Sequence, residues 1–306
     1  MLPIIDFSEF STDDAARRQE IAAEIGTACE TDGFLYLNNH GIRQSVIDAA
    51  FSAVESYFAQ PEAEKWSQCR EPGHYRGYIP TTTFSTDDNG GPSVSYEAFI
   101  VGAEVEPGDP SIADSNGIRW PMPWPAEPAD FRPALTAYWD AVTVVAEDLV
   151  RAFALALGLP EETFASRFIQ PISNMSLLHY LPNPDGIRNT REHFDTNALT
   201  ILMPSPAGGL KVLHRDGRWI EAPPLDGCFV VNVANQMECW SGGRFISTKH
   251  RVKPPAGIDR YSMAYFAMPD YGTVVEPLAV DAPDSSRFKP IHVGQDMANF
   301  VSQFDD

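Results

Sequence analysis

The sequence is short of positive charge and of long apolar runs. Its 306 residues carry 22 lysines and arginines against 42 aspartates and glutamates, a formal net charge of −20. A surface this acidic repels phosphate backbones and anionic lipids, so we expect no nucleic-acid partner and no membrane partner. No apolar run approaches the length that crosses a bilayer, and "MLPIIDFSEF" has no basic region followed by a long apolar core. We therefore expect a protein that is neither inserted in a membrane nor exported.

Cysteine is also scarce. The four cysteines are widely spaced, and no pair has the CxxC spacing of zinc sites or redox dithiols. Free thiols are typical of a reducing compartment, so the predicted location is the cytoplasm.

The composition is that of an ordinary globular protein, with 43% hydrophobic and 21% charged residues. Up to about residue 171, apolar spacing alternates between strand-like and helix-like, with a Pro-rich and Gly-rich connector before the longest helical pattern. The expected elements are strands within 3–10 and 34–42, helices within 13–33 and 45–61, a connector at 104–130 and a helix within 131–160.

From about residue 172 the pattern changes to short apolar runs separated by turn signals. "HRDGRW" indicates a hairpin, because Asp-Gly suits a tight turn between strands. Regular short strands favour an antiparallel barrel or a double-sheet jelly roll. The predicted fold is therefore mainly β with flanking helices. We divide the chain into an N-terminal region (1–120), a connector with a long bracing helix (121–171), a jelly-roll core (172–280) and a C-terminal tail (281–306).

The stretch "HFDTNALTIL" begins with an imidazole and a carboxylate two residues apart, at His193 and Asp195. On a strand these side chains share one face, while Phe194 points away, where we expect it to be packed. His250 ends another predicted strand. Two histidines and one carboxylate form the facial triad that suits non-haem Fe(II). The His-x-Asp pair alone is a weak signal, because a histidine at a strand end is often only a hydrogen-bonded structural residue.

A second pair of residues strengthens the metal interpretation. Arg260 and Ser262, in "RYSMAYF", are again two apart on a predicted strand. Arginine presents a planar fork that matches a carboxylate, and serine adds a hydroxyl donor. A buried arginine without an anion is costly, so a diacid that chelates the iron at its other end is the simplest partner.

The order His-x-Asp, His, Arg-x-Ser resembles the isopenicillin N synthase-like family of Fe(II)/2-oxoglutarate dioxygenases, and the resemblance covers nearly the whole chain. "DGFLYLNNHGI" and "YRGY" resemble its N-terminal region; "VVNVANQMECWSGGRFISTKHRV" resembles its core. The resemblance implies a double-stranded β-helix, iron ligands at His193, Asp195 and His250, and Arg260 with Ser262 on the distal carboxylate of 2-oxoglutarate. It also implies oxidation of a small molecule with O2, by hydroxylation, desaturation or ring closure, and release of succinate and CO2.

One part of the family pattern is altered. Relatives carry Asn-x-Tyr before a proline, and these side chains touch 2-oxoglutarate. Here the stretch is "LLHYLP", which we align with His179 at the Asn place and Leu181 at the Tyr place. His179 is therefore a candidate contact to the co-substrate or the substrate, or a residue that only fills a strand position.

Other functions stay open at this point. An oxidase of the isopenicillin N synthase type would use Arg260 and Ser262 to hold its own substrate, and an ethylene-forming type would fragment 2-oxoglutarate itself. A metal-free jelly-roll binding protein is the alternative outside enzymes. The sequence does not indicate an oligomeric state.

The residues that could meet a substrate combine aromatic and charged groups, which favours a free, polar small molecule such as an amino acid or organic acid. We expect an arginine to bind its carboxylate and Glu97 to bind an amine, although solvated loop charges would give the same pattern. The candidates are Tyr75, Arg76, Tyr78, Glu97, Phe99, Arg188 and Arg191.

Overall fold

Two facing β-sheets and a layer of helices make up the computed structural model, which describes the chain except residues 82–95, 183–191, 254, 279–284 and 305–306. The large sheet has eight strands in the order β1-β2-β9-β6-β11-β5-β4-β3, and only the β1–β2 pair is parallel. Its strands are β1 (Ile4–Asp6), β2 (Phe34–Asn38), β3 (Gly77–Ile79), β4 (Tyr96–Gly102), β5 (Asn174–Tyr180), β6 (Leu199–Met203), β9 (Cys228–Val233) and β11 (Arg260–Ala267).

A three-stranded sheet in the order β10-β7-β8 faces one side of the large sheet. It contains β7 (Leu210–Leu213), β8 (Trp219–Glu221) and β10 (His250–Val252), and a separate pair is formed by β12 (Val274–Val275) and β13 (Ile291–His292). The expected hairpin joins β7 to β8, where Gly217 has φ +85 and its N–H donates to the carbonyl of His214. The two facing sheets confirm the predicted jelly-roll core with flanking helices.

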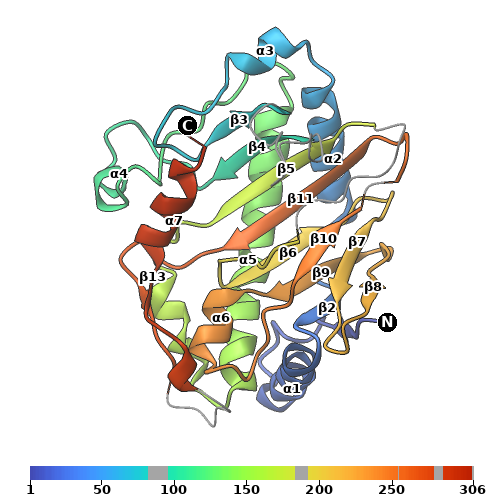
Figure 1. Cartoon of the computed structure of the whole chain (residues 1–306), viewed down its shortest axis with the longest axis vertical. Coiled ribbons are helices and arrows are strands. Elements are labelled where there is room, and N and C mark those ends of the chain that lie inside the picture. Colours follow the sequence, from blue (N-terminus) through green and yellow to red (C-terminus); the bar gives the residue numbers. More distant parts are fainter. Residues whose placement is uncertain (82–95, 183–191, 254, 279–284, 305–306) are drawn as a thin grey trace.

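Helices cover the other side of the large sheet, and α5 lies behind it in Figure 1. The helices are α1 (Ala15–Thr31), α2 (Gln44–Phe58), α3 (Glu62–Trp66), α4 (Pro110–Asp114), α5 (Phe131–Ala156), α6 (Asn235–Trp240) and α7 (Val293–Ser302), with 3₁₀ turns η2 (Glu161–Thr163), η3 (Ala165–Arg167) and η4 (Ser285–Arg287). Among the described residues, none of the helices combines the length and apolar character that a membrane span needs.

The sequence explains where the principal helices form. In α5, apolar residues recur every three or four positions, and Leu135, Val142 and Leu149 are fully buried. In α1, the carboxylate of Asp14 accepts the first backbone N–H groups. The chain turns after α1 at Gly33, where φ is +67 and a Cβ would lie 2.0 Å from a backbone oxygen.

Two apolar cores result from this layering. The larger core lies between the large sheet and the helices, and it includes Phe99 and Leu177 from the sheet and Tyr138 from α5. The smaller core lies between the two sheets and includes Tyr36, Val212 and Val230. Alternate residues of each strand of the large sheet therefore face either the helices or the interior between the sheets.

The structure also differs from the expected elements. The first 120 residues supply four strands of the large sheet itself, so they do more than cover the core. His250 was expected at the end of a strand but begins the three-residue strand β10, and the expected C-terminal tail contains α7, in which Met297 and Val301 are buried. The division at residues 120, 171 and 280 stays a prediction.

Candidate metal centre and co-substrate site

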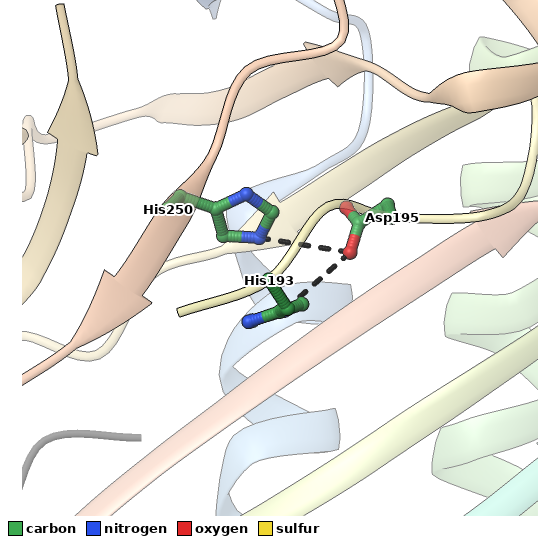
Figure 2. Close-up of side chains that lie close together, drawn as sticks. All are labelled: His193, Asp195 and His250. Atoms are coloured by element: carbon green, nitrogen blue, oxygen red, sulfur yellow. Dashed lines mark ion pairs between the residues drawn. The ribbon is translucent and has the colours of Figure 1, made fainter. Parts of the chain in front are cut away.

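His193, Asp195 and His250 converge on one point between the sheets (Figure 2). His193 and Asp195 lie in the segment before β6, not in a continuous strand, and His250 begins β10. The backbones of His193 and His250 exchange two hydrogen bonds of 3.1 and 3.0 Å, which holds the two segments side by side. Phe194 is not packed as we expected: it is 44% exposed, with Lys249 Nζ 5.6 Å from the ring centre.

The three side chains form a donor set for one cation. His193 Nε2 and His250 Nε2 each lie 3.6 Å from Asp195 Oδ1, and one ligand atom from each residue lies within 4.8 Å of the others. Two imidazole nitrogens and one carboxylate oxygen on one side leave the opposite coordination positions open, as the facial triad of non-haem iron requires.

Neighbouring groups orient Asp195 and His250 for this role. Asp195 Oδ2 accepts hydrogen bonds from Thr200 Oγ1 at 2.6 Å and from Asn232 Nδ2 at 2.9 Å, which leaves Oδ1 for the metal. His250 Nδ1 lies 3.1 Å from the carbonyl of Thr248, so Nδ1 donates there and Nε2 is left as a ligand.

The protonation of these two residues also suits a metal. Burial would raise the pKa of Asp195, but the two imidazoles and the two hydrogen bonds outweigh it and lower that pKa. Burial lowers the pKa of His250 and favours the neutral ring. An ionised carboxylate and a neutral imidazole are the forms that bind metal ions.

Arg260 and Ser262 lie on the interior face of β11, the side that faces the metal centre. Arg260 Nε donates to the carbonyl of Gly208 at 2.8 Å, and Nη1 donates to Ser262 Oγ at 3.1 Å. Arg260 is 1% exposed as a residue, and its guanidinium carbon lies 4.6 Å from the ring centre of Tyr180. In the described part of the chain no carboxylate pairs with it, and burial lowers its pKa. A buried cation in this position matches the distal carboxylate of a diacid.

The register of β5 corrects our alignment of the Asn-x-Tyr positions. Tyr180 pairs with Arg260, and Leu178 pairs with Ser262, so Tyr180 and Leu178 lie on the same interior face as Arg260 and Ser262. His179 pairs with Tyr261 and faces the helices, on the side opposite to Arg260. The prediction that His179 contacts 2-oxoglutarate is therefore not supported, and Tyr180 is the residue of β5 that lies beside Arg260.

Three expected substrate residues also face the helices. Tyr78 donates to Glu97, whose carboxylate is bound by Lys65. Phe99 is fully buried in the larger core. Glu97 and Phe99 are two residues apart on β4, so both side chains lie on the same face of the strand, and that face is turned toward the helices instead of the interior between the sheets. Glu97 is therefore not free to bind a substrate amine. Arg188 and Arg191 lie outside the described residues.

The two remaining expected substrate residues, Tyr75 and Arg76, lie at the face of the large sheet that carries the metal centre. The Arg76 guanidinium occupies the space where a side chain on Gly102 would stand, with Nε 2.0 Å from the position of that missing Cβ. Across the sheet, Gly102 pairs with Asn174, Asn174 pairs with Phe266, and Phe266 pairs with Thr200. Paired residues on neighbouring strands point to the same face, and Thr200 bonds Asp195, so Gly102 lies on the face that carries the metal centre. Tyr75 is buried beside this face and contacts Phe300 of α7.

Sequence reasoning missed Thr200, Asn232 and Tyr180. Strand alternation gives the signal for Thr200 and Tyr180, because each lies an even number of residues from another interior residue on its strand. Asn232 stands out as the single amide in the apolar run "CFVVNV". The distance between Asn232 and Asp195 depends on tertiary pairing and is not visible in the sequence.

Two family models match this chain, one in each half. The model of the 2OG-Fe(II) oxygenase superfamily matches residues 171–269, and the model described as non-haem dioxygenase in morphine synthesis N-terminal matches residues 2–127. A Metarhizium rileyi protein named 2-oxoglutarate-Fe(II) type oxidoreductase ppzC is 30% identical over 294 residues, which are 87% of this chain and 76% of that protein.

Solved structures show the same fold. A full-length Neurospora crassa protein in complex with alpha-KG and thymine has a TM-score of 0.84 at 28% identity, over 98% of this chain and 96% of that one. A Caulobacter crescentus protein of the 2OG-Fe(II) oxygenase family has a TM-score of 0.85 at 27% identity, over 98% of both chains. The chain belongs to the 2OG-Fe(II) oxygenase superfamily. It is a 2-oxoglutarate-dependent dioxygenase whose cofactors are Fe(II), 2-oxoglutarate and O2.

Proposed function

We propose that His193 Nε2, His250 Nε2 and Asp195 Oδ1 hold the Fe(II), and that Arg260 holds the distal carboxylate of 2-oxoglutarate with Ser262. The observation that carries the second assignment is the buried Arg260 guanidinium, which among the described residues has no carboxylate partner. When bound, iron and 2-oxoglutarate supply the oxidising chemistry with O2. The protein positions both groups and excludes water from them.

Tyr180 completes the proposed co-substrate site. Its ring covers one face of the Arg260 guanidinium and restricts how the fork can turn. The side chains of Leu178 and Leu202 lie in the same interior and make its walls apolar. A charge-assisted pair in such surroundings is stronger than one in water, so the diacid should bind mainly through this end and through the metal.

For the prime substrate we propose a free, polar small molecule that carries a carboxylate, bound by Arg76. Two Arg76 nitrogens donate to the carbonyls of Tyr75 at 2.8 Å and Ser173 at 3.4 Å, and Nε has no partner within the described part of the chain. The side chain is 2% exposed, and burial lowers its pKa to about 10, with Arg119 acting in the same direction. An uncompensated buried cation of this kind favours an anionic ligand.

A substrate panel tests this proposal. Amino acids, organic acids, flavonoids and terpenoids are mixed with the Fe(II) enzyme and 2-oxoglutarate, and substrate-dependent succinate is measured. We expect release only with the carboxylate-bearing classes. The variant Arg76→Lys keeps the charge but loses the fork, so it should raise KM for the substrate and leave KM for 2-oxoglutarate unchanged. Release only with the apolar classes would reject the substrate class.

The remaining expectations on partners and location rest on composition. The net charge of −20 supports the prediction that no nucleic acid binds. The four free cysteines are consistent with the proposed cytoplasmic location, because three of them are buried and unpaired.

A further inference from the structure

Four ionisable side chains cross the helix-facing side of the large sheet, behind Arg260. We call Lys65, Glu97, His179 and Asp259 the ionisable cluster. Lys65 Nζ lies 2.7 Å from Glu97 Oε2, and His179 Nδ1 lies 2.8 Å from Glu97 Oε1. His179 Nε2 lies 3.0 Å from Asp259 Oδ1. The first three residues are buried, whereas the Asp259 side chain is 53% exposed. The ionisable cluster therefore ends in solvent at Asp259, the residue directly before Arg260.

His179 meets a carboxylate at each ring nitrogen. These two contacts and the Lys65–Glu97 pair link the four side chains into one hydrogen-bonded network. A buried network whose members are hydrogen-bonded holds them in place.

Aromatic rings fix the plane of His179. The ring of Tyr261 is stacked on it at 4.5 Å, with 7° between the planes, and the ring of Phe58 lies 5.4 Å away. Tyr261 stands between Arg260 and Ser262 in the sequence, with its side chain on the opposite face of the strand. His179 thus contacts the side chains of the residues immediately before and after Arg260: it hydrogen-bonds Asp259 and stacks on Tyr261.

The end of β11 that carries Arg260 is the less firmly paired end. β11 pairs with β5 from Arg260 onward, but its pairing with β6 begins only at Met263. Among the described residues, Arg260 and Ser262 therefore have a neighbouring strand on one side only, and Arg260 is the last residue of that ladder. Ends of strands with few partners open most easily. The bond from Asp259 to His179 lies just beyond the last backbone pair, where it can oppose this opening.

We propose that His179 is a positioning residue for 2-oxoglutarate. By binding Asp259 and stacking on Tyr261, it ties the start of β11 to Glu97 on β4, and this keeps the Arg260 guanidinium aimed at the distal carboxylate. His179 acts through Arg260 and does not touch the co-substrate. The inference rests on the proposed role of Arg260 in binding 2-oxoglutarate.

The test compares two 2-oxo acids on the Fe(II) enzyme without oxygen. 2-Oxoglutarate has the distal carboxylate, whereas 2-oxopentanoate has the same chain length and ends in a methyl group. Dissociation constants are measured from the visible charge-transfer band, and Fe(II) affinity is measured separately by competition with a chelator. The variants are His179→Leu and Asp259→Ala. The control is Asp216→Ala, which removes a similar carboxylate 3.0 Å from His214 in the β7–β8 hairpin.

We expect both variants to weaken 2-oxoglutarate binding about tenfold, which is the scale of one lost hydrogen bond to a charged group. Binding of 2-oxopentanoate, Fe(II) affinity and the control should change less than about twofold. Equal weakening of both acids, or no weakening of either, would overturn the proposal. Asp259 is half exposed, so Asp259→Ala decides the matter if His179→Leu does not fold. Failure of the wild-type enzyme to prefer 2-oxoglutarate over 2-oxopentanoate would instead reject the role of Arg260.

Discussion

Replacing Thr200 by valine should weaken Fe(II) binding without altering any residue that we propose as a ligand. The Thr200 hydroxyl is 2.6 Å from Asp195 Oδ2, and Asn232 supplies the second bond at 2.9 Å. Valine has nearly the same shape, so the change removes one of two donors to a buried carboxylate. A hydrogen bond to a charged group contributes about 1.5–3 kcal/mol, and partners of metal ligands typically account for about 10-fold to 100-fold in affinity.

The measurement is the dissociation constant of Fe(II) under anaerobic conditions, obtained by competition with a coloured chelator. Thr143→Val is the matched control, because it makes the same change on the helix-facing side, where the hydroxyl bonds Tyr265 at 3.3 Å. We expect Thr200→Val to raise the constant by at least about tenfold and the control to leave it within about twofold. Equal constants for Thr200→Val and the wild type would show that this bond does not orient Asp195.

Three further predictions concern other parts of the molecule. Arg260→Ala should raise KM for 2-oxoglutarate by tens- to thousands-fold and KM for the prime substrate far less, because a desolvated charge pair lost in this way costs about 2–5 kcal/mol; an unchanged requirement for 2-oxoglutarate would contradict it. His250→Ala should abolish Fe(II) binding and turnover while thermal unfolding of the metal-free protein stays cooperative, and full activity would disprove its role as a ligand. Lys65→Met should lower the free energy of unfolding in urea by about 3–5 kcal/mol at neutral pH, because it leaves Glu97 buried with one partner fewer. Burial opposes ionisation of Glu97, but hydrogen bonds from its three partners, His179, Lys65 and Tyr78, outweigh burial and lower its pKa below the ordinary value of 4.5. The stabilisation is therefore present above that pH and is lost as the pH falls through the folded-state pKa, so the difference between variant and wild type should shrink on acidification.

Much of this site could be predicted from sequence order. His193, Asp195 and His250 were expected together, and the structure brings them within reach of one ion. Arg260 and Ser262 share a face, as their spacing required. Two residues that are two apart on one strand share a face whichever strands pair with it, so this relation can be predicted without knowing the tertiary structure.

The errors arose where the argument needed two strands at once. His179 and Glu97 were expected in the interior, but which face a strand turns inward depends on its register against its neighbours. Glu97 pairs with His179 and so shares its helix-facing side, whereas Tyr180 is turned toward Arg260. One position of error in aligning "HYLP" was enough to exchange the two faces. Charge alone gave no warning, because a buried ion pair and a substrate clamp use the same residue types.

The arrangement around Asp195 has a consequence for how the enzyme obtains its metal. Thr200, Asn232 and Thr248 orient Asp195 and His250 before any ion arrives, so the pocket fixes direction and spacing but does little to discriminate between divalent ions. Two nitrogens and one oxygen bind Ni²⁺, Cu²⁺ and Zn²⁺ more tightly than Fe²⁺ by the general order of stability. Which ion fills the site is then decided by the metal pools of the cell and by the order of arrival. A preparation of this protein can be well folded, fully metallated and inactive, and its iron content is the quantity that sets its specific activity.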